Sequence, residues 1–280
     1  MRFLGWAVAV VLVVLAIWLP TQLHVQPESI HESEATTELP QVGTVVDVPD
    51  FNQFADVRDK KQAFFSFLAP IVQVENSTIE QEREQIVRIQ EHLLAGNKLS
   101  NAQTKAFATI AKRYNVEIDT NDYEATFAVL LRRVDVVPEA LVLVQAANES
   151  GWGTSRFATE ALNFFGQWCF RKGCGLVPDA RVDGMNHEVR KFSSVNASVR
   201  SYLRNINTHP AYFELRQLRA EKRASGADVR ALDLTPGLLS YSERGEEYIH
   251  ELNSMIRVNR PIIFDVLEPN PNPNLNSAPE

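Results

Sequence analysis

The stretch that most constrains the fold is PEALVLVQAANESGWG, residues 138–153. Pro138 suits the first position of a helix, almost no charge follows it, and Gly151 and Gly153 supply the backbone freedom with which helices end. We therefore predict a core helix, which needs a sizeable hydrophobic interior around it. Glu149 shares a helical face with Val142 and Gln145, so its carboxylate projects from the rim of that interior.

This position predicts unusual chemistry for Glu149. Partial burial disfavours the charged carboxylate, and the negative end of the helix dipole acts in the same direction. Both effects raise the pKa and keep a proton available near neutral pH, as a general acid requires. A capping or salt-bridged glutamate is the alternative explanation, and spacing alone does not separate the two.

The N-terminus predicts export. Residues 1–20 contain an apolar run from Phe3 to Leu19, preceded by an arginine and with Trp6 and Trp18 near its two ends. We interpret it as an uncleaved signal-anchor that spans a membrane, with a cleaved signal peptide as the alternative. The net charge of −7, without a dense Lys/Arg stripe, argues against a nucleic-acid partner.

The rest of the chain divides by composition. Residues 21–50 are acidic and proline-dotted, which predicts a disordered linker, and residues 268–280 predict a disordered tail. Residues 51–136 have helical periodicity and predict a support region, with a kink or break at Pro70 and a new helix starting at the Ser77 cap. Residues 137–267 form the second folded region. The Asp-Gly pair within residues 181–192 predicts a short β-hairpin, so the fold class is mainly α with one small β element.

Cys169 and Cys174 lie close together in CFRKGC. In an exported protein we predict a disulfide between them, with packed or free thiols as the alternative. His187 alone does not make a convincing zinc site with them, so no metal is predicted.

The run QAANESGWGTSRFA, followed by NFFGQWCF, resembles the family-73 glycoside hydrolases, bacterial N-acetylglucosaminidases of the lysozyme-like superfamily. The segments FGQWCF, KGCG, HEVRKFSSVNASVRSY, NTHPAYFELR and YSERGEEYI are similar to the Bax-like branch of that family. The resemblance covers roughly residues 138–260. Phe164 departs from the leucine usual in the family's N-L-F-G motif, which is a conservative change.

The resemblance implies a lysozyme-like α+β catalytic domain over residues 137–267. It makes Glu149 the acid that protonates the leaving oxygen of a β-1,4 bond after N-acetylglucosamine in peptidoglycan. Glu188 in HEVRKF matches the second carboxylate, contributed by the β-lobe; a surface hairpin charge is the alternative, with the substrate's acetamido group taking the second role. Tyr241 in YSERG matches a tyrosine that lines the cleft, or it is an ordinary packed aromatic.

Three further residues are candidates for substrate binding. Trp152 and Trp168 suit stacking on sugar faces, although tryptophans beside glycine turns also fill cores. Asn163 suits bracing of its loop better than contact with substrate. The resemblance implies no metal and no organic cofactor.

These expectations combine into one reading of function. The chain is a peptidoglycan hydrolase, an endo-β-N-acetylglucosaminidase of the periplasm, anchored to the inner membrane or secreted after signal cleavage. Its partners are glycan strands of peptidoglycan and the membrane. The alternatives are a lytic transglycosylase and a catalytically inactive peptidoglycan-binding scaffold.

Overall fold

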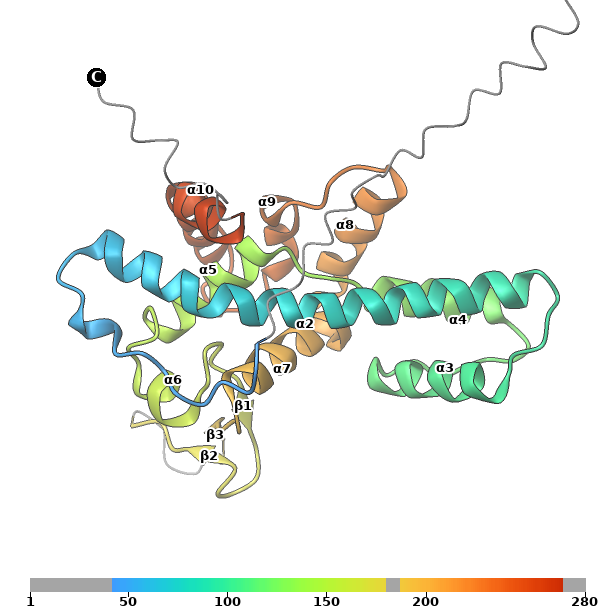
Figure 1. The fold of residues 1–280 in the computed structure, drawn as a ribbon, viewed down its shortest axis with the longest axis horizontal. Coiled ribbons are helices and arrows are strands. Elements are labelled where there is room, and N and C mark those ends of the chain that lie inside the picture. The colour runs from blue at the N-terminus through green and yellow to red at the C-terminus, as the bar shows by residue number, and fades with distance from the viewer. Residues whose placement is uncertain (1–41, 180–186, 269–280) are drawn as a thin grey trace, which may run out of the picture. The chain divides into compact units, whose positions relative to one another are not determined.

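A computed structural model describes residues 42–179 and 187–268, which are mainly α-helical with one small sheet (Figure 1). This confirms the predicted fold class. The longer helices are α2 (Val57–Leu94), α3 (Asn101–Arg113), α4 (Tyr123–Arg133), α5 (Glu139–Ser150), α6 (Arg156–Ala161), α7 (Val195–Thr208), α8 (Phe213–Ala224) and α10 (Glu246–Leu267). The short helical segments are η1 (Phe51–Gln53), η2 (Pro210–Tyr212), α9 (Ala231–Leu234) and η3 (Thr235–Leu238).

The predicted core helix is α5, and it lies at the centre of the packing. Residues 141–147 of α5 are fully buried. Helices α2 and α10 both pack on α5, and α2 also packs on α10 and α7. One hydrophobic cluster runs through all four helices, which fixes the end of α5 firmly in space.

A kink or break was predicted at Pro70, and a break is wrong, because α2 runs continuously through this proline. The Ser77 cap is wrong for the same reason: Thr78 beside it donates its hydroxyl to the carbonyl of Val74, one turn back in the same helix. A proline inside a helix removes one backbone hydrogen bond. Buried apolar residues on both sides offset this loss, namely Phe64, Phe65, Leu68, Ala69, Ile71 and Val72.

The β element is a three-stranded antiparallel sheet in the order β1-β3-β2. Strand β3 (Glu188–Arg190) lies within the predicted hairpin segment and pairs with β1 (Trp168–Cys169) and β2 (Gly175–Leu176). Both partners precede β3, so the sheet is wider than the predicted hairpin. The Asp-Gly turn at 183–184 lies outside the described residues.

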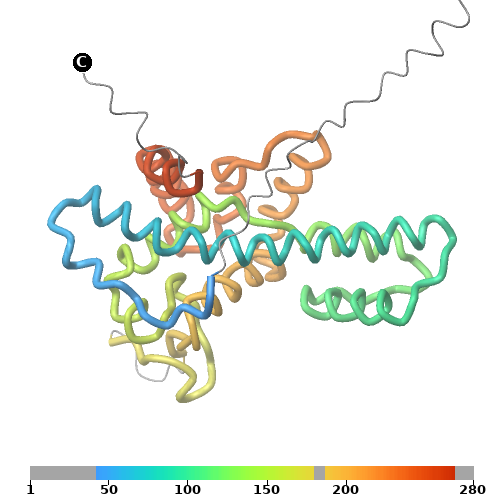
Figure 2. The backbone as a smooth tube through the Cα atoms, viewed as in Figure 1, coloured from blue at the N-terminus to red at the C-terminus, as the bar shows by residue number. Residues whose placement is uncertain are grey.

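The predicted disordered linker ends too late, because residues 42–50 make specific contacts. Val45 accepts a backbone hydrogen bond from Val195 and donates one to the side chain of Asn196 at 2.9 Å. Val42, Val45 and Val48 also pack against the core. Figure 2 traces this segment in blue, passing the start of α7 before the chain turns into α2.

The predicted signal-anchor (1–20), most of the linker (21–41) and nearly all of the tail (269–280) fall outside the described residues. Among residues 42–179 and 187–268, no helix combines the length and apolar character that crossing a membrane requires.

Candidate active site

Glu149 sits at the last turn of α5, where a tight loop ends the helix. Gly151 adopts the left-handed conformation that stops α5. The Ser150 hydroxyl donates to the carbonyl of Ala146 at 2.6 Å and accepts the backbone N–H of Gly153 at 2.8 Å. A Cβ on Gly153 would lie 2.5 Å from the ring of Phe51, so only glycine fits there. The residues around Glu149 in the Glu-Ser-Gly-Trp-Gly motif therefore hold its backbone in place.

The two carboxylate oxygens of Glu149 have different surroundings. Oε1 accepts a hydrogen bond from the Tyr248 hydroxyl at 2.9 Å and a long one from the Asn148 amide at 3.5 Å. Oε2 faces Gly166, where an added Cβ would lie 3.7 Å away. Gly166 has φ +63° and is exposed, so this side of the carboxylate is not covered by a side chain from residue 166.

Tyr248 is part of a buried polar chain that reaches back into the core. Its hydroxyl accepts a hydrogen bond from the Gln145 side-chain amide at 3.0 Å. The Gln145 side-chain oxygen accepts in turn from the Tyr202 hydroxyl at 2.5 Å. Because Gln145 supplies a donor to Tyr248, the tyrosine directs its own proton to Glu149. Tyr248 was not among the candidates that the sequence indicated. The signal that could have found it is a tyrosine hydroxyl on the apolar face of an amphipathic helix, because a buried hydroxyl needs a polar partner.

Burial raises the pKa of Glu149, as expected from its place at the rim of the core. The hydrogen bonds from Tyr248 and Asn148 lower it and partly oppose the burial. Glu251 raises the pKa and Arg244 lowers it, and these two residues form an ion pair of 2.7 Å with each other. The dominant cause is the removal of water, which favours a protonated carboxyl group.

Tyr241 lies beside this arrangement. Its ring stacks on the ring of Tyr248 with centroids 5.5 Å apart and an angle of 6°. Its hydroxyl donates to the carbonyl of Phe165 at 3.1 Å, and Phe165 immediately precedes Gly166. Tyr241 is half-buried, so it ties the loop opposite Glu149 to α10 and also presents a partly open face.

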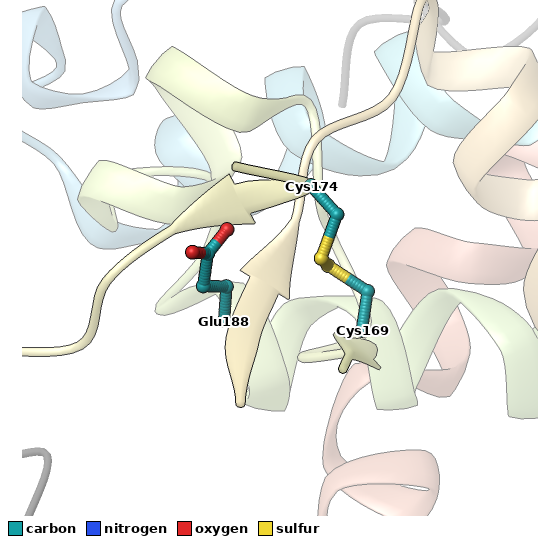
Figure 3. A group of neighbouring side chains, drawn as sticks. All are labelled: Cys169, Cys174 and Glu188. Carbon is teal, nitrogen blue, oxygen red and sulfur yellow. A yellow bond between two sulfur atoms is a disulfide. The ribbon is translucent and has the colours of Figure 1, made fainter. Parts of the chain in front are cut away.

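Glu188 is buried at the start of the central strand β3, next to the disulfide that joins Cys169 and Cys174 (Figure 3). Its two oxygens accept the backbone N–H groups of Gly173 and Gly175, each at 2.8 Å. The carboxylate therefore braces the loop that the disulfide closes.

The donor atoms of Cys169, Cys174 and Glu188 lie within 4.8 Å of one another, a grouping that metal sites also show. Zinc and other thiophilic metals are held by thiolates, whereas these two sulfurs are bonded to each other. The donor set as it stands does not fit a metal.

The three remaining candidates lie in different environments. Trp152 packs edge-on against Phe64 and Phe65, with centroids 5.6 and 5.3 Å away, so most of it belongs to the core. Trp168 is 55% exposed and stacks on His187. Asn163 is buried and joins Gln167 and Arg190 through their carbonyls at 2.8 and 2.9 Å, which is a brace between β1 and β3.

A groove of about 1200 Å³ begins one residue beyond Gly166. It is lined by Gln167 and Trp168 from the β-lobe, by residues of α7 and α2, and by Arg113 at the end of α3. The helical region before residue 137 thus contributes one wall of this groove.

Comparison with known proteins gives two findings. Residues 124–260, from α4 into α10, match the glucosaminidase family model, described as mannosyl-glycoprotein endo-β-N-acetylglucosaminidase. The chain is also 34% identical over 216 residues to Protein bax of Escherichia coli strain K12, covering 77% of this chain and 76% of that protein. No solved structure gives a significant match. The chain therefore belongs to the family-73 glucosaminidases, a glycoside hydrolase family, and within it to the Bax-like branch.

Proposed function

We propose that this protein is an endo-β-N-acetylglucosaminidase that cleaves the β-1,4 bond after N-acetylglucosamine in peptidoglycan. The observation that carries the proposal is the environment of Glu149: a partly buried carboxyl group with a raised pKa, held by Tyr248 on one oxygen and uncovered by residue 166 on the other. Family membership supports a glycoside hydrolase.

In this proposal Glu149 is the general acid. Tyr248 directs its proton to Oε1, so the acidic proton resides on Oε2, on the side of Gly166. A glycosidic oxygen placed there receives the proton as its bond to the anomeric carbon breaks, and Glu149 becomes a carboxylate. The oxygen of a water molecule then bonds to the anomeric carbon, and the proton that this water releases returns to the Glu149 carboxylate.

The second catalytic role has two candidates. Glu188 comes from the β-lobe and is the residue that matches the family's second carboxylate. Its two backbone hydrogen bonds support a bracing role, which favours attack by the substrate's own acetamido group in the first step. Substitution of Glu188, described below, separates these candidates.

Product analysis tests the bond and the reaction type. Purified protein is incubated with isolated sacculi, and the released fragments are separated and identified by mass spectrometry. Reducing ends of N-acetylglucosamine are expected. Ends of 1,6-anhydro-muramic acid would instead establish a lytic transglycosylase, and binding without any release would establish an inactive scaffold.

We also propose that the protein acts in the periplasm, tethered by residues 1–20. The apolar run there supports the proposal. Mass determination of the mature N-terminus in membrane fractions is the test. A chain that starts near residue 20 or later would instead mean a cleaved signal peptide.

A further inference from the structure

The groove that starts at Gln167 is strongly cationic, although the whole chain carries a net charge of −7. Five cationic side chains line it against two carboxylates. The cations are Arg113, Arg190, Lys191, Arg200 and Arg204, and the carboxylates are Glu75 and Glu82.

Both carboxylates are already paired. The Glu75 carboxylate accepts hydrogen bonds from Nε and Nη2 of Arg200 at 2.8 and 2.6 Å, which is a bidentate ion pair between α2 and α7. Glu82 pairs with Arg113 and also accepts the Tyr114 hydroxyl at 2.8 Å. These pairs join the walls of the groove and neutralise two of its five cations.

The other three cations have no carboxylate within 4 Å among the residues that the structure describes. Arg190 lies over the ring of Phe192, with 5.2 Å between its guanidinium carbon and the ring centroid. Lys191 and Arg204 are exposed to solvent. The unpaired positive charge therefore extends from β3 to α7 and faces the interior of the groove.

Two exposed aromatic rings border the same groove. Trp168 is 55% and Phe170 is 74% exposed, in a part of the β-lobe held by the disulfide and by Glu188. Aromatic faces suit sugar rings or apolar side chains, and cations suit carboxylates. A glycan strand with carboxylated peptide branches offers sugar rings to the aromatic side chains and carboxylates to the cations.

We propose that this groove binds the carboxylate-bearing peptide branches of the peptidoglycan strand, so that the enzyme selects glycan that carries peptides. The inference rests on the proposed function, because it takes the same polymer as ligand. The position of the groove supports it: Gln167 lines the groove, and the preceding residue, Gly166, faces the Glu149 carboxylate.

Binding is measured with the full chain carrying Glu149→Gln, which keeps the substrate intact. Three ligands are compared: untreated sacculi, sacculi stripped of phosphate-bearing polymers by hydrofluoric acid, and stripped sacculi whose carboxylates are converted to methylamides by carbodiimide and methylamine. The groove variant adds Lys191→Glu and Arg204→Glu. The matched control adds Arg257→Glu and Arg260→Glu, two exposed arginines of α10 for which the described residues offer no ion-pair partner.

The groove variant is expected to bind unmodified sacculi about tenfold more weakly, whereas the control retains its affinity. The parent should bind methylamidated sacculi as weakly as the groove variant binds unmodified ones. Equal affinity of the parent for stripped and methylamidated sacculi would overturn the inference, as would equal losses in the groove and control variants. Loss of binding on hydrofluoric acid treatment alone would overturn it too, because the ligand would then be a phosphate polymer.

Turnover separates this inference from the proposed function. The active protein is expected to cleave methylamidated sacculi with a raised KM and the same kcat, because the acid at Glu149 does not depend on the branch. Absence of glycan cleavage on stripped and methylamidated sacculi alike would refute the proposed function, while the binding comparison would still decide the role of the groove.

Discussion

Glu149 combines a proton-holding environment with a cost to the folded state. Its pKa is raised by burial, so the folded protein disfavours the carboxylate relative to the unfolded chain. The resulting loss of stability is absent below the unfolded pKa and develops as the pH rises from there through the folded pKa. At neutral pH the acid role proposed for Glu149 therefore comes with a loss of folding stability.

Replacement of Glu149 by glutamine removes both the transferable proton and the loss of stability caused by burying a carboxylate. Turnover on sacculi is expected to fall by a factor on the order of 10²–10⁴, typical of losing a positioned acid. The thermal midpoint should equal that of the unmodified protein near pH 4 and be equal or slightly higher at pH 7.

The control for this substitution is Glu160→Gln, an exposed glutamate of α6. It should change neither turnover nor melting. A Glu149→Gln protein that melts lower but keeps its turnover per folded molecule would show that the residue is structural.

Tyr248→Phe tests the partner of the acid. The tyrosine hydroxyl lowers the pKa of Glu149, so its removal should raise that pKa further. Because the acid must be protonated, the alkaline limb of the kcat/KM profile is expected to move to higher pH. Loss of orientation at Oε1 should lower kcat about tenfold, the effect of one hydrogen bond to a charged group. An unmoved limb would mean that Tyr248 only packs.

Local sequence patterns indicated Glu149 as a candidate site residue but did not indicate Tyr248, because the two residues are far apart in the sequence. The helix, its glycine stop and the rim position of residue 149 all lie within sixteen consecutive residues. Tyr248 meets Glu149 across 99 residues, through the packing of α10 on α5. A helical period places a tyrosine on the buried face, but which polar group lies opposite depends on tertiary structure.

At the scale of elements, the β-lobe is stabilised by side-chain contacts more than by the backbone hydrogen bonds between its strands. Its strands contain two or three residues each, too few to be stable alone. The disulfide, the Glu188 carboxylate and the Asn163 amide hold them together. These contacts restrain the loop that borders the groove.

Glu188→Gln is expected to weaken this lobe. An amide cannot accept at both of its ends, so either Gly173 or Gly175 loses its acceptor and meets a donor. Stability should fall by about 1–3 kcal/mol, the cost of an unsatisfied buried group. Turnover per folded molecule should fall much less than in Glu149→Gln. A loss as large as that of Glu149→Gln, with unchanged melting, would make Glu188 the base or nucleophile.

Reduction of the Cys169–Cys174 bridge provides a separate test of the lobe. Thiol labelling of oxidised, denatured protein should detect no free thiol, and reduction should expose both. Because the closed loop is short, the loss of stability should be about 2 kcal/mol. Labelling of both cysteines without reductant would show that the bridge does not form in solution.

The elements whose limits the sequence patterns missed share one physical cause. Pro70 and the Ser77 cap gave genuine local stop signals, yet α2 continues because Phe65, Leu68 and Val72 are buried around them. Likewise, the composition of residues 42–50 indicated disorder, whereas Val45 pairs with α7. Tertiary burial overrode local propensity in both cases.

At the scale of the whole described chain, the support region and the catalytic region share one core. Phe64 and Phe65 of α2 pack on Trp152, which lies three residues after Glu149 in the loop that ends α5. The buried Asp135 carboxylate binds Arg223 of α8 and lies 3.6 Å from Arg83 of α2. The boundary predicted between residues 136 and 137 therefore crosses a continuous interior.

This continuity predicts how fragments behave. A fragment of residues 137–267 lacks α2, so the apolar surface of α5 that faces α2, together with one side of Trp152, becomes exposed to water. The burial lost with α2 corresponds to more free energy than the net folding stability of a typical domain. The fragment is expected to lack near-ultraviolet circular dichroism and a cooperative melt, whereas residues 42–268 should unfold in one transition and retain turnover on sacculi. A 137–267 fragment that melts cooperatively and cleaves sacculi would instead establish an independent catalytic domain, with the first helices as a separate support.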